Sequence, residues 1–177
     1  MKKIKWVFLV TVIVLLLVSP CVNAEFVTHN KEVLRGIKSI GVEIGKLPHE
    51  ARNLGITRDS LRKHVESKLR LAGINVATPD EHKANPEMPF LLVAIILGYN
   101  NPTCIYAVTV SLNEKVQLKR DPKIISYATP WWRIMKGEHI GKAGVERDVE
   151  NTLKYLLNEF TNDYLAVNPK LESKQQG

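Results

Sequence analysis

The chain has 177 residues, of which 45% are hydrophobic and 24% are charged, with 25 basic and 18 acidic side chains. This length suits one ordinary domain with a substantial core, and no repeat or composition shift indicates a second domain. Three of the basic residues lie within the first 24, so the rest of the chain carries a net charge of only +4. Such a modest charge argues against a nucleic-acid-binding protein.

Residues 1–24 are predicted to be a cleaved secretory signal peptide. Lysines open the segment, an apolar run fills residues 7–18, and Val22 and Ala24 precede a cleavage site before Glu25. An uncleaved membrane anchor is an alternative, but the run is shorter than the roughly 20 residues that span a bilayer. Lipidation of Cys21 is a third reading, which Pro20 disfavours. Membrane contact is expected only if the segment is retained or Cys21 is lipidated.

Cleavage leaves Cys104 as the single cysteine, so no internal disulfide is expected. Cys104 begins an apolar strand, which favours a buried and inert thiol over one that pairs with another chain.

The first half of the domain is predicted to be a strand, a helix and a strand. Residues 37–45 alternate, with Ile40, Val42 and Ile44 on one face. Residues 56–73 form the strongest helix pattern, with Thr57 as N-cap. A short strand at 74–78 follows directly, which favours a parallel crossover. Residues 46–55 and 79–89 are predicted to be connections.

The second half is predicted to hold three strands and a helix. The strands cover residues 90–99, 104–118 and 124–135, with turns at 100–103 and 119–123 and with Pro130 at a bulge or an edge. A glycine-rich loop at 136–144 leads to a helix at 145–167, which Asn168 and Pro169 end. Residues 170–177 are predicted to be a disordered polar tail.

This order, β-α-β-β-β-β-α, predicts a single α+β domain over residues 25–169. Two amphipathic helices can cover only one face of a mixed sheet of about five strands, which gives a two-layer sandwich.

No motif in the chain predicts catalysis, a cofactor or a metal. The glycine loop is one residue too short for the phosphate-binding pattern, and Ala143 stands where that pattern has Ser or Thr. The histidines lack the spacing of metal ligands; they are His29, His49, His64, His82 and His139. Asn162, Asp163 and Asn168, late in the last helix, are interpreted as residues that cap the helix or bind backbone.

The segment "FTNDYLAVNP", residues 160–169, resembles the ending of a group of small exported bacterial proteins that close on F-x-N-D-Y-L-x-x-N-P. Those proteins also carry a segment like "VESKLRLAGINV" and a tryptophan strand before a glycine loop, so the resemblance covers about residues 34–169. It implies an exported protein and brings no activity with it. The order of elements is also similar to small periplasmic α/β domains, such as the N-terminal domain of the Tol-Pal protein TolB and the lipoprotein activators of cell-wall synthases, which is an analogy of topology alone.

The adjacent tryptophans Trp131 and Trp132 predict an interaction surface. Side chains alternate along a strand, so one ring enters the core and the other lies on the uncovered sheet face; we expect Trp131 inside. The strand at 90–99 is apolar on both faces, and the set Leu91, Val93 and Ile95 is assigned with the tryptophans to the candidate interface. We therefore expect a non-enzymatic periplasmic domain that binds another protein or a second copy. A domain that binds an apolar small molecule or lipid is the alternative, and the N-terminal segment after residue 24 is another possible cover for that face.

Overall fold

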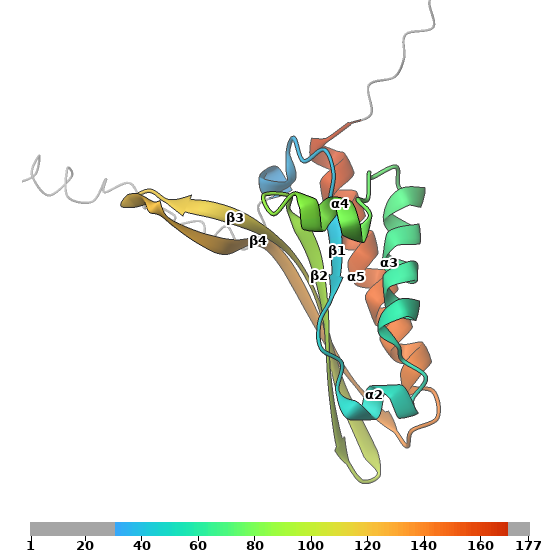
Figure 1. The fold of residues 1–177 in the computed structure, drawn as a ribbon. Helices are drawn as coiled ribbons and strands as arrows, with labels where there is room; N and C mark the ends of the chain where they lie inside the picture. The colour runs from blue at the N-terminus through green and yellow to red at the C-terminus, as the bar shows by residue number, and fades with distance from the viewer. Residues whose placement is uncertain (1–30, 170–177) are drawn as a thin grey trace, which may run out of the picture.

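The computed structural model describes residues 31–169, in which a mixed four-stranded sheet is covered by helices (Figure 1). The strands lie in the order β1-β2-β3-β4, with β1 parallel to β2 and the other neighbours antiparallel. Their bounds are Gly41–Ile44, Phe90–Asn100, Thr103–Leu118 and Asp121–Ile140. The α+β class and the mixed sheet are confirmed. The predicted signal peptide and the polar tail lie outside the described residues.

The helices account for the remaining regular structure of residues 31–169. A short 3₁₀ helix, η1, opens this part of the chain, and α5 closes it. The bounds are η1 Lys31–Leu34, α2 His49–Asn53, α3 Arg58–Leu71, α4 Pro79–Ala84 and α5 Val145–Val167. None of these helices is long and apolar enough to cross a membrane.

Both long helices form where the sequence predicts them. Thr57 caps α3 in a capping box with Ser60, and Leu61, Val65 and Leu69 form its buried stripe. Helix α5 begins after Gly144, whose φ of 99° suits glycine, and it buries ten side chains along its length. Both helices pack on the same face of the sheet (Figure 1).

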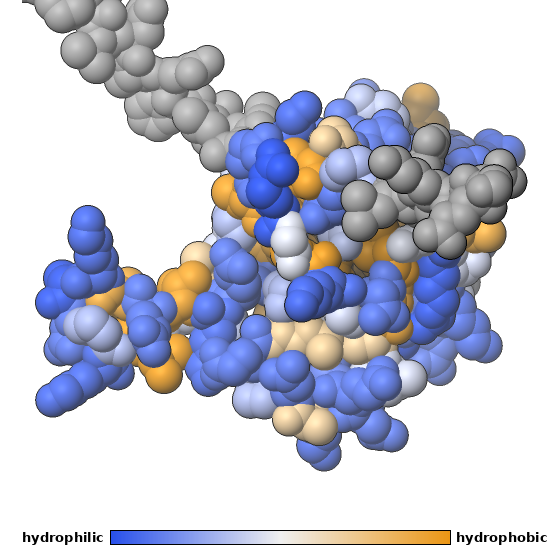
Figure 2. All heavy atoms as spheres, turned by 90° about the horizontal axis from the view of Figure 1, so that it is seen from above, coloured by the Kyte–Doolittle hydropathy of each residue, from blue (hydrophilic) through white to orange (hydrophobic). Residues whose placement is uncertain are grey.

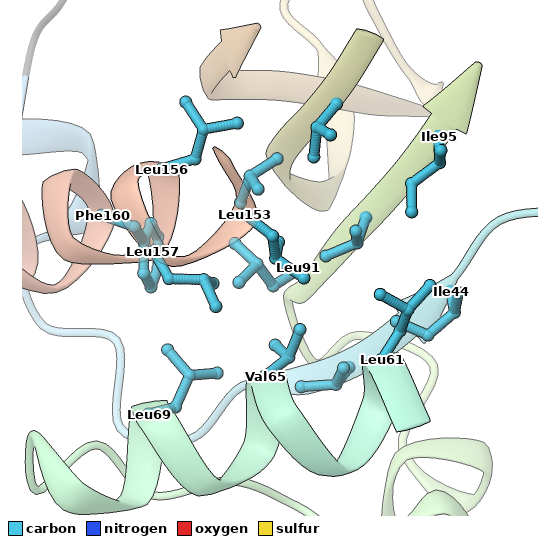
Figure 3. Packing of buried hydrophobic residues seen from close by; sticks show 14 of the residues in the cluster. Ile44, Leu61, Val65, Leu69, Leu91, Ile95, Leu153, Leu156, Leu157 and Phe160 are labelled. Carbon is cyan, nitrogen blue, oxygen red and sulfur yellow. The ribbon is translucent and has the colours of Figure 1, made fainter. Parts of the chain in front are cut away.

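The core lies between this face of the sheet and the two helices (Figure 3). Leu91, on β2, lies among Leu153 and Leu157 of α5 and Val65 of α3 (Figure 3). Burying each such side chain stabilises the fold by roughly 1.5–3 kcal/mol before entropy is counted.

Two predicted connections contain helices. Residues 46–55 hold α2, and residues 79–89 hold α4, where Thr78 and Glu81 form a capping box and Pro79 occupies the first turn. This capping box also shortens the strand predicted at 74–78. The chain turns into α4 after a single parallel bridge between Ile40 and Val76, so residues 31–169 form four strands where about five were expected.

Strand β4 is longer than predicted, because the first half of the expected glycine loop belongs to it. Residues 136–140 pair with residues 103–107 of β3. Gly137 lies opposite Tyr106, and a Cβ there would stand 2.3 Å from the Tyr106 ring. The glycine therefore leaves room for a ring that packs toward α5, where the Tyr106 hydroxyl lies 3.5 Å from Thr152.

Candidate functional site

The assignment of β2 residues to the candidate interface is wrong. Leu91, Val93 and Ile95 lie on the face of β2 that packs against the helices, with at most 3% of each residue exposed. They pair with Leu112, Val110 and Val108 of β3, which are also buried. The uncovered face of β2 carries the other set, which is Leu92, Ala94 and Ile96.

The two tryptophans lie on opposite faces of the sheet, as strand alternation requires. Trp131 is 2% exposed and Trp132 is 50% exposed, so the prediction that Trp131 is the core residue is confirmed, and its inclusion in the candidate interface is wrong. The Trp131 ring packs edge-on against Phe160 of α5, with centroids 4.9 Å apart. Trp132 lies opposite Ser111 on the uncovered face.

The side of the sheet that no helix of residues 31–169 covers, called the open face here, is mostly apolar. The segment 25–30, expected as another cover for this face, lies outside the described residues. Its members are identified by strand register as the residues that alternate with the core set. Five large apolar residues on it are between 43% and 80% exposed: Ile96, Ile105, Trp132, Ile134 and Ile140. Leu92, Ala94, Ala107 and Thr109 lie between them and are half-buried. A contiguous exposed apolar surface of this kind is typical of an interaction site.

The β3–β4 hairpin continues past the sheet as a projecting ribbon, called the arm here, which comprises residues 114–128. The pairing shifts between Leu112 and Glu114, opposite Trp131 and Ala128, so Pro130 lies in the predicted bulge. Beyond this point the hairpin bends away from the helices (Figure 1). From above, the arm stands apart from the body and carries hydrophobic groups among hydrophilic ones (Figure 2). Ile124, Ile125 and Tyr127 are 44–61% exposed.

Three contacts hold the root of the arm to the body. Tyr127 makes an edge contact with Phe90 of β2, with centroids 6.0 Å apart. The Thr129 hydroxyl donates to Asn113 at 2.8 Å. Lys115 forms an ion pair with Glu87 at 2.6 Å, and this hydrogen bond raises the pKa of Lys115. The arm is therefore fastened at its base, and no contact of this kind to the rest of residues 31–169 is found toward its tip.

A polar cluster supports Trp131 from the helix side. The indole Nε1 donates to Asp163 Oδ2 at 2.9 Å, and Arg133 donates to the same oxygen at 3.2 Å. The Arg133 guanidinium also lies 4.8 Å from the centroid of the Trp131 ring and 3.5 Å from Glu159. Asp163 therefore fixes a core ring, whereas the sequence indicated only capping or backbone contacts for it.

Asn168 matches its predicted structural role. Its amide donates to the carbonyls of Leu34 and Tyr164 at 2.8 and 3.0 Å, and its side-chain oxygen accepts from the Gly36 N–H at 2.7 Å. The Tyr164 hydroxyl donates to the carbonyl of Ile37 at 2.6 Å. The ending of α5 thus ties down the segment that leads into β1.

Cys104 is buried, as expected, and lies beside a cavity of about 390 Å³ that the sequence did not predict. Burial raises the pKa of its thiol, against a smaller lowering effect of Lys142. Leu54, Leu97 and Tyr99 form the apolar part of the cavity wall, and the Lys142 ammonium lies 5.1 Å from the Tyr99 ring centroid.

The histidines of the described part do not gather into a site. His82 of α4 lies 3.4 Å from Glu43 of β1, and His139 of β4 lies 2.7 Å from Asp148 of α5, so the two pairs are made by different elements. Among residues 31–169, no three His, Cys, Asp or Glu side chains are placed to hold a metal ion together. His29 lies outside these residues.

No family model and no curated protein matches the chain. Solved structures of the PelC dodecamer from Paraburkholderia phytofirmans have a partly similar chain path. A single-residue variant of PelC is 15% identical, with 71% of this chain and 90% of that chain covered at a TM-score of 0.39. Another PelC structure is 13% identical, with 71% and 87% covered at a TM-score of 0.37. TM-scores of this size do not establish a shared fold.

Proposed function

We propose that this chain is an exported interaction module, which acts by binding another protein rather than by catalysis. In this proposal the body is a two-layer α+β domain, in which the helices hold one side of the sheet rigid and the open face meets the partner. The N-terminal segment 1–24 directs the chain to the periplasm and is removed. The role is that of an accessory protein of the cell envelope.

The observation that carries this proposal is the exposure of the open face. Monomeric proteins rarely leave large contiguous apolar patches in water, and exposed aromatic anchors carry much of the energy of protein binding. Here Trp132 and Ile134 are next-but-one neighbours on β4, and both lie on the face opposite α3 and α5. Trp132 therefore gives the surface an aromatic residue of the type that dominates interfaces.

Site-specific photocrosslinking in intact bacterial cells tests this proposal. A photoreactive phenylalanine analogue replaces Ile134 on the open face, and the same analogue replaces Leu71 as the matched control. Leu71 is also an exposed apolar residue, 83% accessible, but it lies on α3. We expect a crosslinked adduct of defined mass from position 134 and none from position 71.

The result that would overturn the proposal is an absence of adducts from position 134, and from a second open-face position at Ile96, in cells that export the chain. The intact mass of the purified protein tests export separately. A chain that begins at Glu25 supports cleavage, whereas a retained residue 1 or a lipid on Cys21 contradicts it.

A second candidate function is the binding of a small apolar molecule, which the cavity beside Cys104 favours. Its volume of about 390 Å³ falls in the range of ligand pockets, and its walls combine apolar groups with Lys142. The space next to Trp131, by contrast, is filled by Phe160. Native mass spectrometry of the purified chain tests this candidate, which predicts a retained small molecule that Leu97→Trp displaces.

A further inference from the structure

We propose that the partner of the open face is a second copy of the chain, and that the arm of one copy lies across the open face of the other. This inference rests on the proposed function, because it names the partner of the same surface. It is drawn from the construction of the arm, its length, its charge and its direction.

The arm has apolar side chains on both of its sides and no core of its own. Strand register places Ile125 and Tyr127 on one side, with Lys115 and Gln117. Ile124 lies on the other side, with Val116 and Leu118 of the paired strand. A two-stranded hairpin alone is marginally stable in water, so a long one with exposed apolar groups gains stability when another surface covers it.

The length of the arm matches the width of the open face. Its paired part covers five residues of β3, from Glu114 to Leu118, which extend about 17 Å at roughly 3.4 Å per residue. Four strands spaced about 4.8 Å apart make a sheet roughly 14 Å wide between its outer strands. One arm can therefore cross the sheet from β4 to β1.

The charges of the two surfaces are opposite. The arm tip carries three basic residues, Lys119, Arg120 and Lys123, against one acidic residue, Asp121. The open face carries Glu43 and Glu138 against Lys136, as assigned by strand register. A basic tip on an acidic-to-neutral apolar face is favoured over contact between two tips or two faces, because like charges then stay apart.

The arm points away from its own body, toward the position of a neighbouring molecule. Its strands run on from β3 and β4 and leave the body on the side opposite the helices (Figure 1). The arm and the open face thus form two sides of one angular surface, and a second molecule of the same shape can fill that angle. Because arm and face are different patches, the contact pairs unlike surfaces, which closes into a dimer when it is reciprocal and into a larger ring or chain when it is not.

The experiment measures the mass of the purified mature chain by light scattering over a range of concentrations, with three variants. In the arm variant, an Asn-Gly turn replaces residues 117–125 and joins Val116 to Ser126. The face variant is Ile134→Glu. The control is Leu71→Glu, an equally drastic change on the helical side. We expect the parent and the control to be oligomers and both other variants to have the mass of one chain.

Mixing the arm variant with the face variant separates this proposal from other modes of association. The arm variant keeps an intact face, and the face variant keeps an intact arm, so the mixture should form a complex of one chain of each. Two chains that associate face to face would not do this, because the arm variant would then remain an oligomer alone.

Three results would overturn the inference: a parent that has the mass of one chain at every concentration, an arm variant that keeps the mass of the parent, or a mixture without a complex. Thermal melts show whether each variant folds, and Ile125→Asp replaces the arm variant if the shortened hairpin does not. A parent of single-chain mass together with crosslinks from position 134 to a different protein would overturn this inference and leave the proposed function standing. A parent of single-chain mass that gives no crosslinks from position 134 or from position 96 would overturn both proposals.

Discussion

Replacing each tryptophan of the pair by alanine should have opposite consequences for stability. Trp131 is buried against Phe160 and donates a hydrogen bond to Asp163, whereas half of Trp132 faces solvent. Truncation of a buried Phe or Trp to Ala typically costs about 3–5 kcal/mol. Loss of the hydrogen bond to a charged partner adds to this, but Arg133 still donates to Asp163, which limits the extra cost.

We therefore expect Trp131→Ala to lower the free energy of unfolding by about 4–5 kcal/mol, a large share of the roughly 5–15 kcal/mol that stabilises a typical domain. Trp131→Phe keeps most of the ring packing and loses the hydrogen bond, so it should cost about 1.5–3 kcal/mol. Trp132→Ala should cost less than about 1 kcal/mol, the range of strand propensity at an exposed site.

Urea unfolding followed by far-ultraviolet circular dichroism is the suitable assay, because the signal does not depend on the tryptophan that is removed. Measurements belong at a concentration low enough for every variant to have the mass of one chain. Equal unfolding midpoints for Trp131→Ala and Trp132→Ala would refute the reasoning, because both rings would then make equal contributions and the assignment of faces would be wrong.

Further predictions concern the ends of the domain and its thiol. Asn168→Ala removes two hydrogen bonds between the end of α5 and the segment before β1, and a third to the Tyr164 carbonyl within α5; it should cost about 2–3 kcal/mol, with a matching fall in the urea midpoint, and an unchanged midpoint would contradict this. Cys104 should resist iodoacetamide at pH 8 in the folded chain and react in urea, as read by mass. Because burial raises the pKa of Cys104, the unfolded thiol ionises first, so stability should decline as the pH rises above about 8.5, and Cys104→Ala should lessen that decline. Truncation after Lys170 should leave the melting temperature unchanged.

Features that depend on local sequence were predictable. The cap of α3 by Thr57, the periodic stripe of α5 and the bulge at Pro130 each follow from a few neighbouring residues. Helix α4 was equally readable, because Thr78 and Glu81 have the spacing of a capping box and Pro79 suits the first turn. The three prolines of residues 79–89 and the short length of the helix indicated a loop instead, and this also produced the expected fifth strand.

The arm was not predictable from periodicity. Its residues alternate no less than those of the sheet, so the pattern indicates only a hairpin. Whether a hairpin lies in a sheet or projects from it depends on what covers its two sides. Helix α5 contacts β4 through Trp131 and Arg133, and past the bulge the ribbon leads away from α3 and α5 (Figure 1). That boundary is a property of tertiary structure.

The face of β2 that enters the core is decided by its pairing with β3, which the hydrophobic pattern of β2 alone does not reveal. Both faces of β2 are apolar, so its own residues do not show whether Leu91 or Leu92 lies in the core. Strand β3 is less ambiguous, because Tyr106, Val108, Val110 and Leu112 alternate with smaller or polar residues over most of that length. Strands β2 and β3 are joined by two residues, Asn101 and Pro102, and a turn of that length pairs residue 100 with residue 103. Counting back from that pair places Leu91 opposite Leu112, which lies on the core face of β3. Leu91, Val93 and Ile95 therefore lie in the core. Leu92, Ala94 and Ile96 lie on the open face. The length of one turn therefore decides which residues of a doubly apolar strand are available for binding.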